Sequence, residues 1–213
     1  MKKILIALSV LAALAVAMTG INIAQKGFGV YGGESLEQIL GVPADRATPT
    51  DVEKLSRAKV VKLFYAASAP LYHEMNGEYK AAMVGGGIMG PPSRLYVAFI
   101  FGPGRWEGKA FSPKEGFGYN IFKSSKNGKN IIRRTRKMKV FIGKSQYDGK
   151  DSFNLDYSSF ESGLFHSMRD EIRKINHRLY IGMGSLAAGG GTVNPMPFIL
   201  SGEPSPWIGP DRE

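Results

Sequence analysis

The sequence predicts a mainly β protein, an antiparallel meander that closes into a barrel or folds into a sandwich. From residue 77 onward, short runs rich in Tyr, Phe, Ile and Val alternate with clusters of Gly, Pro and Asn, at intervals of about ten residues. Asn127-Gly128 and Asp148-Gly149 provide turn residues that β-hairpins favour. We expect strands near 77–84, 94–102, 107–112, 117–124, 130–143, 151–158, 165–175, 178–185 and 196–201.

Composition limits the classes of protein that this chain can be. Its 213 residues, 43% of them hydrophobic, suffice for one domain with a hydrophobic core, and a multi-domain enzyme is not expected at this length. The absence of cysteine excludes disulfides, thiolate nucleophiles and the common structural zinc sites. A net charge of +10 favours anionic partners, such as phospholipid headgroups, nucleic acid or acidic small molecules.

The N-terminus has the pattern of an export segment. Lys2 and Lys3 precede a long uncharged run, which is typical of a signal peptide or a membrane anchor. Cleavage after Ala15-Val16-Ala17 would release the domain into the periplasm. Retention of the 21 uncharged residues Ile4–Ala24 would instead anchor the chain in the inner membrane. In both cases we expect a cytoplasmic N-terminus and an extracytoplasmic domain.

Helical patterns are confined to the segment between the export signal and the strands. A short helix is expected at 35–40, and an amphipathic helix at 51–67, where Thr50 and Glu53 have the spacing of a capping box. The predicted organisation is therefore a signal or anchor helix at 1–24, a linker with a short amphipathic helix at 25–70, a barrel at 71–203 and a C-terminal tail at 204–213.

No motif predicts a cofactor, a metal or a catalytic residue. Gly85–Gly90 matches G-x-G-x-x-G, but Pro91 and Pro92 follow where the dinucleotide fingerprint needs a helix, so we expect a flexible hairpin loop. The histidines share no metal-ligand spacing: they are His73, His166 and His177. We therefore expect neither a cofactor nor a metal site.

The segment Lys123–Lys144 contains nine Lys and Arg residues and no acidic residue. If a strand spans it, Arg134, Arg136 and Met138 share one face with several aliphatic residues. An inward orientation of that face would let the two arginines bind an anionic headgroup while the apolar residues line an acyl pocket. The alternative is a solvated basic hairpin. Nucleic acid is not expected as a partner, because the export signal places the domain outside the cytoplasm.

A second charged row follows in the strand expected at 165–175. Arg169, Glu171 and Arg173 share one face of a hairpin that turns near Asn176-His177. This row is either an internal ion network that orients a polar ligand or a structural ladder. The predicted ligand-binding residues are therefore Arg134, Arg136, Met138, Arg169 and Arg173.

Several short motifs resemble those of small bacterial lipocalin-like barrels of the GXWXG-domain kind. The resemblance spans roughly residues 75–200, and its opening motif has Tyr in place of Trp and Ala in place of the second Gly. The matching segments are Gly77-Glu78-Tyr79-Lys80-Ala81, Trp106-Glu107-Gly108-Lys109-Ala110-Phe111, Asp156-Tyr157, Arg169-Asp170-Glu171-Ile172-Arg173 and Leu179-Tyr180-Ile181-Gly182. The resemblance implies a calycin-type barrel of about eight strands, with an interior for a hydrophobic molecule and no defined catalytic residues.

These observations lead to three hypotheses of function. The first is an exported or membrane-anchored barrel that binds a lipid or another hydrophobic or anionic small molecule. The second is a non-catalytic accessory subunit of a larger membrane complex, with its N-terminal helix in the membrane. The third is an isomerase or lyase that uses a buried carboxylate, Asp156 or Asp170. Trp106 and Phe111 bracket Gly108 and are expected in the core.

Overall fold

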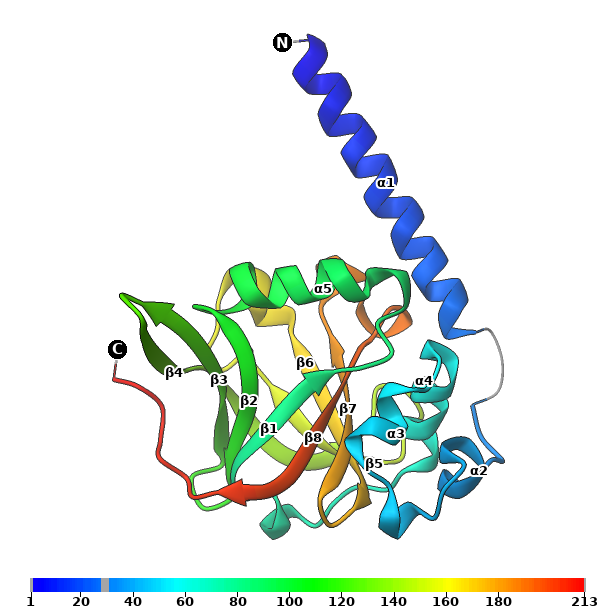
Figure 1. Cartoon of the computed structure of the whole chain (residues 1–213), viewed down its shortest axis with the longest axis vertical. Coiled ribbons are helices and arrows are strands. Elements are labelled where there is room, and N and C mark those ends of the chain that lie inside the picture. The colour runs from blue at the N-terminus through cyan, green and yellow to red at the C-terminus, as the bar shows by residue number, and fades with distance from the viewer. Residues whose placement is uncertain (1, 28–30, 213) are drawn as a thin grey trace.

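Eight antiparallel strands pair in the order of the sequence, and the last strand pairs with the first to close a barrel (Figure 1). This computed structural model describes residues 2–27 and 31–212. The mainly β meander predicted from the sequence is thereby confirmed. The strands are β1 (Gly77–Met83), β2 (Arg105–Ser112), β3 (Phe117–Lys126), β4 (Lys129–Lys144), β5 (Asp151–Asp156), β6 (Arg169–Asn176), β7 (Leu179–Ser185) and β8 (Met196–Ser205).

Helical segments precede the barrel and connect its strands. They are α1 (Lys2–Lys26), α2 (Leu36–Leu40), η1 (Ala44–Arg46), α3 (Pro49–Glu53), α4 (Arg57–Ala66), η2 (Tyr72–Glu74), η3 (Gly87–Met89), α5 (Gly90–Tyr96), η4 (Val97–Phe101), η5 (Gly163–Ser167), η6 (Ala187–Gly189) and η7 (Gly191–Val193). Residues 28–30 of the predicted linker lie outside the described residues.

The prediction of one continuous helix at 51–67 is wrong. Two helices, α3 and α4, replace it, because Ser56 adopts an extended conformation and caps a new helix with its hydroxyl group. The capping box also lies two residues earlier than predicted: Thr48 and Asp51 form it. The short helix near 35–40 is present as α2, which Ser35 caps.

The strand predicted at 94–102 is wrong. That segment forms α5 and η4, which cross one end of the barrel (Figure 1). The flexible hairpin loop expected at Gly85–Gly90 is also wrong, because the segment contains η3 and is followed by the helix α5. Pro91 and Pro92 fit the first turn of this helix, where the missing N–H group costs nothing. The strand predicted to start at residue 165 starts at Arg169, and η5 precedes it.

Two hydrophobic layers lie on the two sides of the barrel wall. The interior is filled mainly by aromatic and large aliphatic side chains, including the buried rings of Phe111, Phe122 and Phe153. On the outside of β7 and β8, buried residues of α2 and α4, such as Leu63 and Phe64, pack against Ile181 and Met183. The helical segment before residue 67 therefore covers one outer wall of the barrel.

Four connections between strands lie at the end of the barrel that α5 crosses, which we call the α5 end. They are residues 84–104, 127–128, 157–168 and 186–195. The helix α1 projects from this same end (Figure 1). Arg57 fixes the base of α1, because its Nε donates to the carbonyl oxygen of Asn22 at 3.0 Å. Among the described residues, no helix combines the length and the apolar character that crossing a membrane requires.

Candidate functional site

Four polar side chains from four different parts of the sheet meet in the interior of the barrel. Lys109 extends from β2, Asn120 from β3 and Asp170 from β6, while Tyr157 follows β5. All four are fully buried. The Nζ atom of Lys109 lies 2.7 Å from Oδ2 of Asp170, 2.7 Å from the Tyr157 hydroxyl oxygen and 2.9 Å from Oδ1 of Asn120. We call these four residues the interior polar cluster.

Hydrogen bonding within the cluster is almost complete. Lys109 uses its three ammonium protons on the three acceptors just described. The Tyr157 hydroxyl donates to Oδ2 of Asp170 at 2.9 Å, and Asn120 accepts a further bond from the indole Nε1 of Trp106 at 3.0 Å. Such a satisfied network fixes the positions of its members across the barrel.

The surroundings of the cluster are strongly apolar. Aromatic rings of Trp106, Tyr157 and Phe198 lie within 5.4 Å of the Lys109 ammonium, measured to the ring centroids. Burial lowers the pKa of Lys109, and the nearby Asp170 acts in the opposite direction. Burial also raises the pKa of Tyr157 well above its usual value, so the phenol remains a donor at neutral pH.

A cavity of about 30 Å³ lies between the cluster and the α5 end of the barrel. Within the described part of the chain, two buried polar atoms of residues that line this cavity have no hydrogen-bond partner: Oδ1 of Asp170 and the hydroxyl of Tyr96. Gly184 leaves room for Oδ1, since a Cβ there would lie only 2.9 Å from it. The remaining lining is apolar and includes Phe101, Met168 and Met196.

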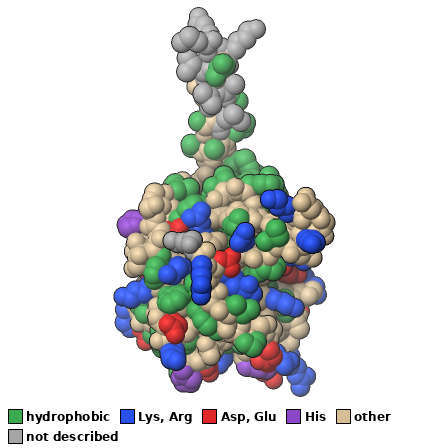
Figure 2. Space-filling model, turned by 90° about the vertical axis from the view of Figure 1, so that its left-hand side faces the viewer, with side chains coloured by type: hydrophobic (Ala, Val, Ile, Leu, Met, Phe, Trp, Pro, Cys, Tyr) green, Lys and Arg blue, Asp and Glu red, His purple; other side chains and the backbone are tan. Residues whose placement is uncertain are grey.

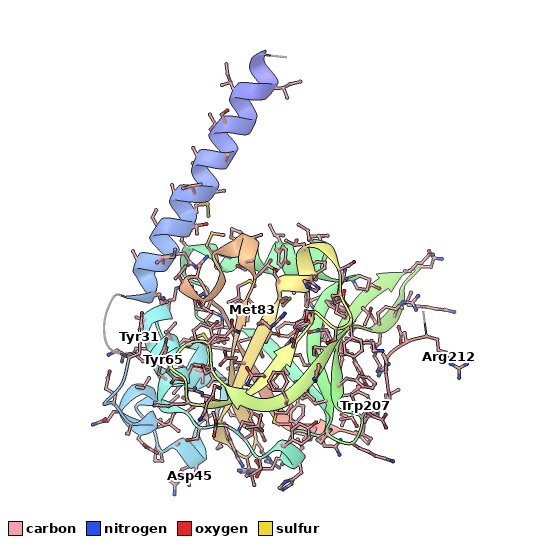
Figure 3. The ribbon with its side chains drawn as sticks, turned by 180° about the vertical axis from the view of Figure 1, so that it is seen from behind. Tyr31, Asp45, Tyr65, Met83, Trp207 and Arg212 are labelled. Carbon is pink, nitrogen blue, oxygen red and sulfur yellow. The ribbon has the colours of Figure 1, made fainter. Side chains whose placement is uncertain are left out.

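An open cleft of about 760 Å³ adjoins this cavity on the side of the barrel. It forms where β1 and β2 separate beyond Lys80 and Gly108, so that α5 covers the gap. Met83, Val97 and Trp106 line both the cleft and the cavity (Met83 is labelled in Figure 3). These three side chains are therefore the wall between the interior polar cluster and the outside.

The predicted alternation of β4 fails at Arg136. This residue has a φ of +57°, and the register with β3 shifts between Gly118 and Asn120, so the strand contains a bulge. A bulge moves the following side chains to the other face. Arg134 consequently lies on the outer wall and Met138 in the interior, and the prediction that both share one inward face is wrong.

The two arginines of β4 form separate contacts. Arg134 pairs with Glu78, with 2.6 Å between Nε and Oε1. Arg136 lies at the α5 end, where its Nε donates to the carbonyl oxygen of Phe101 at 2.8 Å and its Nη1 pairs with Glu161 at 2.6 Å. Arg136 therefore holds the end of η4 over the interior.

The predicted row on β6 lies on the outside of the barrel. Arg173 is fully buried beneath α4, where it pairs with Asp148 at 2.6 Å and its guanidinium group covers the Phe64 ring. Arg169 is partly exposed and pairs with Asp156 at 3.1 Å. Of the five predicted ligand-binding residues, two contact the interior polar cluster, and both do so through Asn120 Nδ2. The sulfur of Met138 lies 3.6 Å from it, and the backbone carbonyl oxygen of Arg136 accepts a hydrogen bond from it at 3.1 Å. Ligand contact by all five remains a prediction.

Lys109, Asn120 and Tyr157 were not predicted as site residues, although the sequence pattern contained a signal. Lys109 lies two residues before Phe111 on the same strand, so their side chains share one face, and the structure confirms that Phe111 is fully buried. Asn120 shares a face with Phe122 in the same way. A polar residue in phase with core residues predicts an interior polar site. Trp106 is partly buried rather than a full core residue, since it lines the cleft. No group of three metal-ligating residues exists among the described residues.

Comparisons with known proteins identify the fold alone. No family model matches the chain, and no curated protein matches it. A crystal structure of a protein from Thermomonospora curvata is similar, with a TM-score of 0.52 over 72% of this chain and 92% of that chain. The two sequences are 14% identical.

Proposed function

We propose that this protein is an exported or membrane-anchored β-barrel that binds a small, mainly apolar molecule carrying a hydrogen-bond donor. One observation carries the proposal: Asp170 Oδ1 and the Tyr96 hydroxyl are buried without partners among the described residues, and both residues line one apolar cavity. A buried polar atom without a partner costs about 1–3 kcal/mol, which a bound donor group would recover.

The cluster favours a donor over an anion as the polar group of the ligand. Lys109 already donates all three of its protons, so it has none left for an anionic headgroup. Of the two atoms without a partner in the described part of the chain, one is an oxygen of Asp170, which accepts hydrogen bonds and repels anions. A hydroxyl, as in an alcohol, a phenol or a hydroxylated lipid, fits this requirement.

Entry through the side of the barrel is the simplest route. The cavity of about 30 Å³ has room for about one water molecule, so a larger ligand needs the wall between cavity and cleft to move. That wall includes Val97 of η4 and the ring of Trp106. The apolar body of the ligand would then occupy the cleft, and its donor group would reach Asp170.

Binding is tested with 1-naphthol as the probe and naphthalene as the matched compound without a donor. The full chain in detergent carries Trp207→Phe, so that Trp106 is the only tryptophan and reports quenching. We expect 1-naphthol to bind about tenfold more tightly than naphthalene, the difference that one hydrogen bond provides. Equal quenching by both compounds would contradict the proposed donor site.

Matched valine variants separate binding in the cleft from partition into detergent. Val97→Phe fills the wall of the cavity and should abolish the tighter binding of 1-naphthol. Val193→Phe adds the same bulk at an exposed position of η7 and should leave binding unchanged. If Val97→Phe binds 1-naphthol as tightly as the unsubstituted chain, the ligand does not enter between β1 and β2.

A second candidate function is a structural subunit of a membrane complex. The dense filling of the interior favours it, since Phe101 packs against Phe122, Tyr157 and Phe165 with centroid distances of 5.5, 6.3 and 5.6 Å. Native mass spectrometry of the protein from mild detergent distinguishes the two functions. A retained small molecule supports the binding function, and a larger assembly with no small molecule supports the structural one.

A further inference from the structure

Exposed hydrophobic side chains gather at the α5 end of the barrel. Three of the four connections at this end contribute them: Ile88, Leu95, Phe99, Ile100, Leu164 and Val193. Phe99 is the most exposed of these, at 78%. Figure 2 shows hydrophobic side chains at the top of the barrel, around the base of the projecting helix. Such a cluster of exposed apolar side chains marks an interaction surface.

The fourth connection at this end is basic. The β3–β4 turn places exposed Lys126 and Lys129 at its tip, and exposed Arg105 and Arg133 lie near the same ends of β2 and β4. Among the described residues, neither Lys126 nor Lys129 forms an ion pair. Arg105 pairs with Glu107 and Arg133 with Asp211, so the charge available to an anionic partner at this corner is that of Lys126 and Lys129.

The helix α1 leaves the barrel on this same side. Its side chains along the projecting part are apolar and exposed, as at Val10, Leu14 and Val16. A mainly apolar groove of about 370 Å³ lies between the base of α1 and α5, and it is lined by Ala15, Met89 and Leu164 among others. This groove thus joins the exposed apolar side chains of the α5 end to those of α1, although Thr19, Asn22 and Ser93 also line it.

We propose that the α5 end rests on a bilayer that contains anionic phospholipids. The exposed side chains Leu95, Phe99 and Ile100 insert among the acyl chains, while Lys126 and Lys129 contact the headgroups. Apolar side chains beside basic ones are the arrangement that an interfacial segment needs. This inference rests on the membrane anchoring included in the proposed function, and it adds that the cleft beside α5 opens next to the lipid.

The consequence for binding is direct. Leu95, Val97 and Ala98 line the cleft between β1 and β2 from the same segment that contacts the bilayer. A hydrophobic molecule dissolved in the membrane would reach the interior polar cluster without crossing water. Hydroxylated lipids are therefore the substrate class that this arrangement favours.

Single labelling sites test the contact with lipid, because the native chain has no cysteine. Phe99→Cys and Leu71→Cys, each labelled with the fluorophore NBD, place the same probe at the α5 end and at an exposed site near the opposite end. The full chain is reconstituted into phosphatidylcholine vesicles with and without phosphatidylglycerol, and doxyl-labelled lipid serves as the quencher. We expect quenching of about twofold or more at position 99 and little at position 71.

Charge variants test the role of the basic turn. Lys126→Gln with Lys129→Gln should reduce the quenching at position 99 in vesicles that contain phosphatidylglycerol. Lys144→Gln with Lys150→Gln removes the same charge at the opposite end and should change nothing. Equal effects of the two double variants would overturn the assignment of headgroup contact to Lys126 and Lys129.

Vesicle flotation separates the failure of this inference from the failure of anchoring. Protein that floats with the vesicles while position 99 is unquenched is anchored, but its α5 end does not rest on lipid, and this inference alone is overturned. Protein that does not float refutes membrane anchoring itself, on which both proposals draw. Binding of 1-naphthol in detergent is independent of both results and still reports on the interior site.

Discussion

Lys109 on β2 and Asp170 on β6 form an ion pair across the interior of the barrel, with 2.7 Å between Nζ and Oδ2. Neither side chain reaches solvent, so each charge depends on the other and on the hydrogen bonds of Tyr157 and Asn120. Buried pairs of this kind add little net stability, because the desolvation of both ions offsets their attraction. The pair instead determines where a polar group can bind inside an apolar barrel.

Replacing one member of the pair should lower the free energy of unfolding far more than replacing both. Lys109→Met leaves the Asp170 carboxylate buried without its cation, and we expect a loss of about 3–5 kcal/mol in the free energy of unfolding. Lys109→Met combined with Asp170→Leu should recover most of that loss. Urea denaturation of the full chain measures both. A single Lys109→Met variant as stable as the native chain would show that the pair does not form in solution.

The sequence could predict the barrel because the signals of its strands are local. Alternating apolar residues and Asn-Gly or Asp-Gly turns specify hairpins, and each of these two turns does connect neighbouring strands. The segment 94–102 could not be separated from a strand, because a short apolar run such as Tyr96–Phe101 fits a buried strand or a buried helix equally well. Its tertiary position over the end of the barrel favours the helix.

The site was less predictable than the fold, for a physical reason. The alternation of side chains along a strand is reliable only between bulges, and the bulge at Arg136 puts Arg134 and Met138 on opposite faces of β4. Nothing in the local sequence marks that bulge. The sequence did show that Lys109 shares a face with Phe111. Its partners Asp170, on β6, and Tyr157, directly after β5, are distant in sequence and meet Lys109 only in the folded barrel.

Arg57 should be essential for holding α1 against the barrel. It is buried and donates to the carbonyl oxygens of Asn22, Gly85 and Pro195 at 3.0, 2.9 and 2.8 Å, and burial lowers its pKa to about 10. Arg57→Ala leaves these oxygens without their donor and should cost about 2–4 kcal/mol of unfolding free energy. It should also speed tryptic cleavage at Lys26.

The exposed Arg46 provides the matched control for that variant. Arg46→Ala removes the same side chain from the surface and should change the unfolding free energy by less than about 0.5 kcal/mol. Cleavage at Lys26 should then proceed as in the native chain. Similar cleavage rates in Arg57→Ala and Arg46→Ala would mean that other contacts hold the base of α1.

Glu171 should make stability depend on pH. Burial raises the pKa of this carboxyl group, which lies under the β4–β5 connection, where the Gln146 N–H donates to its Oε1 at 2.7 Å. The unfolded chain therefore loses this proton at a lower pH than the folded chain does, and stability falls as the pH rises through the interval between the two pKa values. Glu171→Gln should raise the melting temperature at neutral pH.

The benefit of Glu171→Gln should disappear in acid. As the pH falls toward the normal range of a glutamate, the native carboxyl group is protonated in the folded protein and resembles the amide. Thermal melts of the two proteins between about pH 8 and pH 4.5 measure the difference. A constant difference over that range would show that burial does not hold the proton on Glu171.

Gly182 on β7 should be required for the position of Phe198, and through it for the site. A Cβ at residue 182 would lie 2.2 Å from Cζ of the Phe198 ring. That ring cannot simply move away, because it packs edge-to-face against Trp106 and lies 5.2 Å from the Lys109 ammonium. We expect Gly182→Ala to cost about 1–3 kcal/mol of unfolding free energy and to shift the fluorescence of Trp106.

Two further variants assign that loss to the contact with the ring. Phe198→Leu gives the new methyl group room, so the double variant should be more stable than the sum of the single effects, by about 1 kcal/mol. Gly189→Ala adds a methyl group where nothing lies within 4 Å, and its effect should be within about 0.5 kcal/mol of zero. If the losses of unfolding free energy in Gly182→Ala and Phe198→Leu simply add, the ring does not lie over Gly182. Phe198 then does not transmit changes on β7 to Lys109.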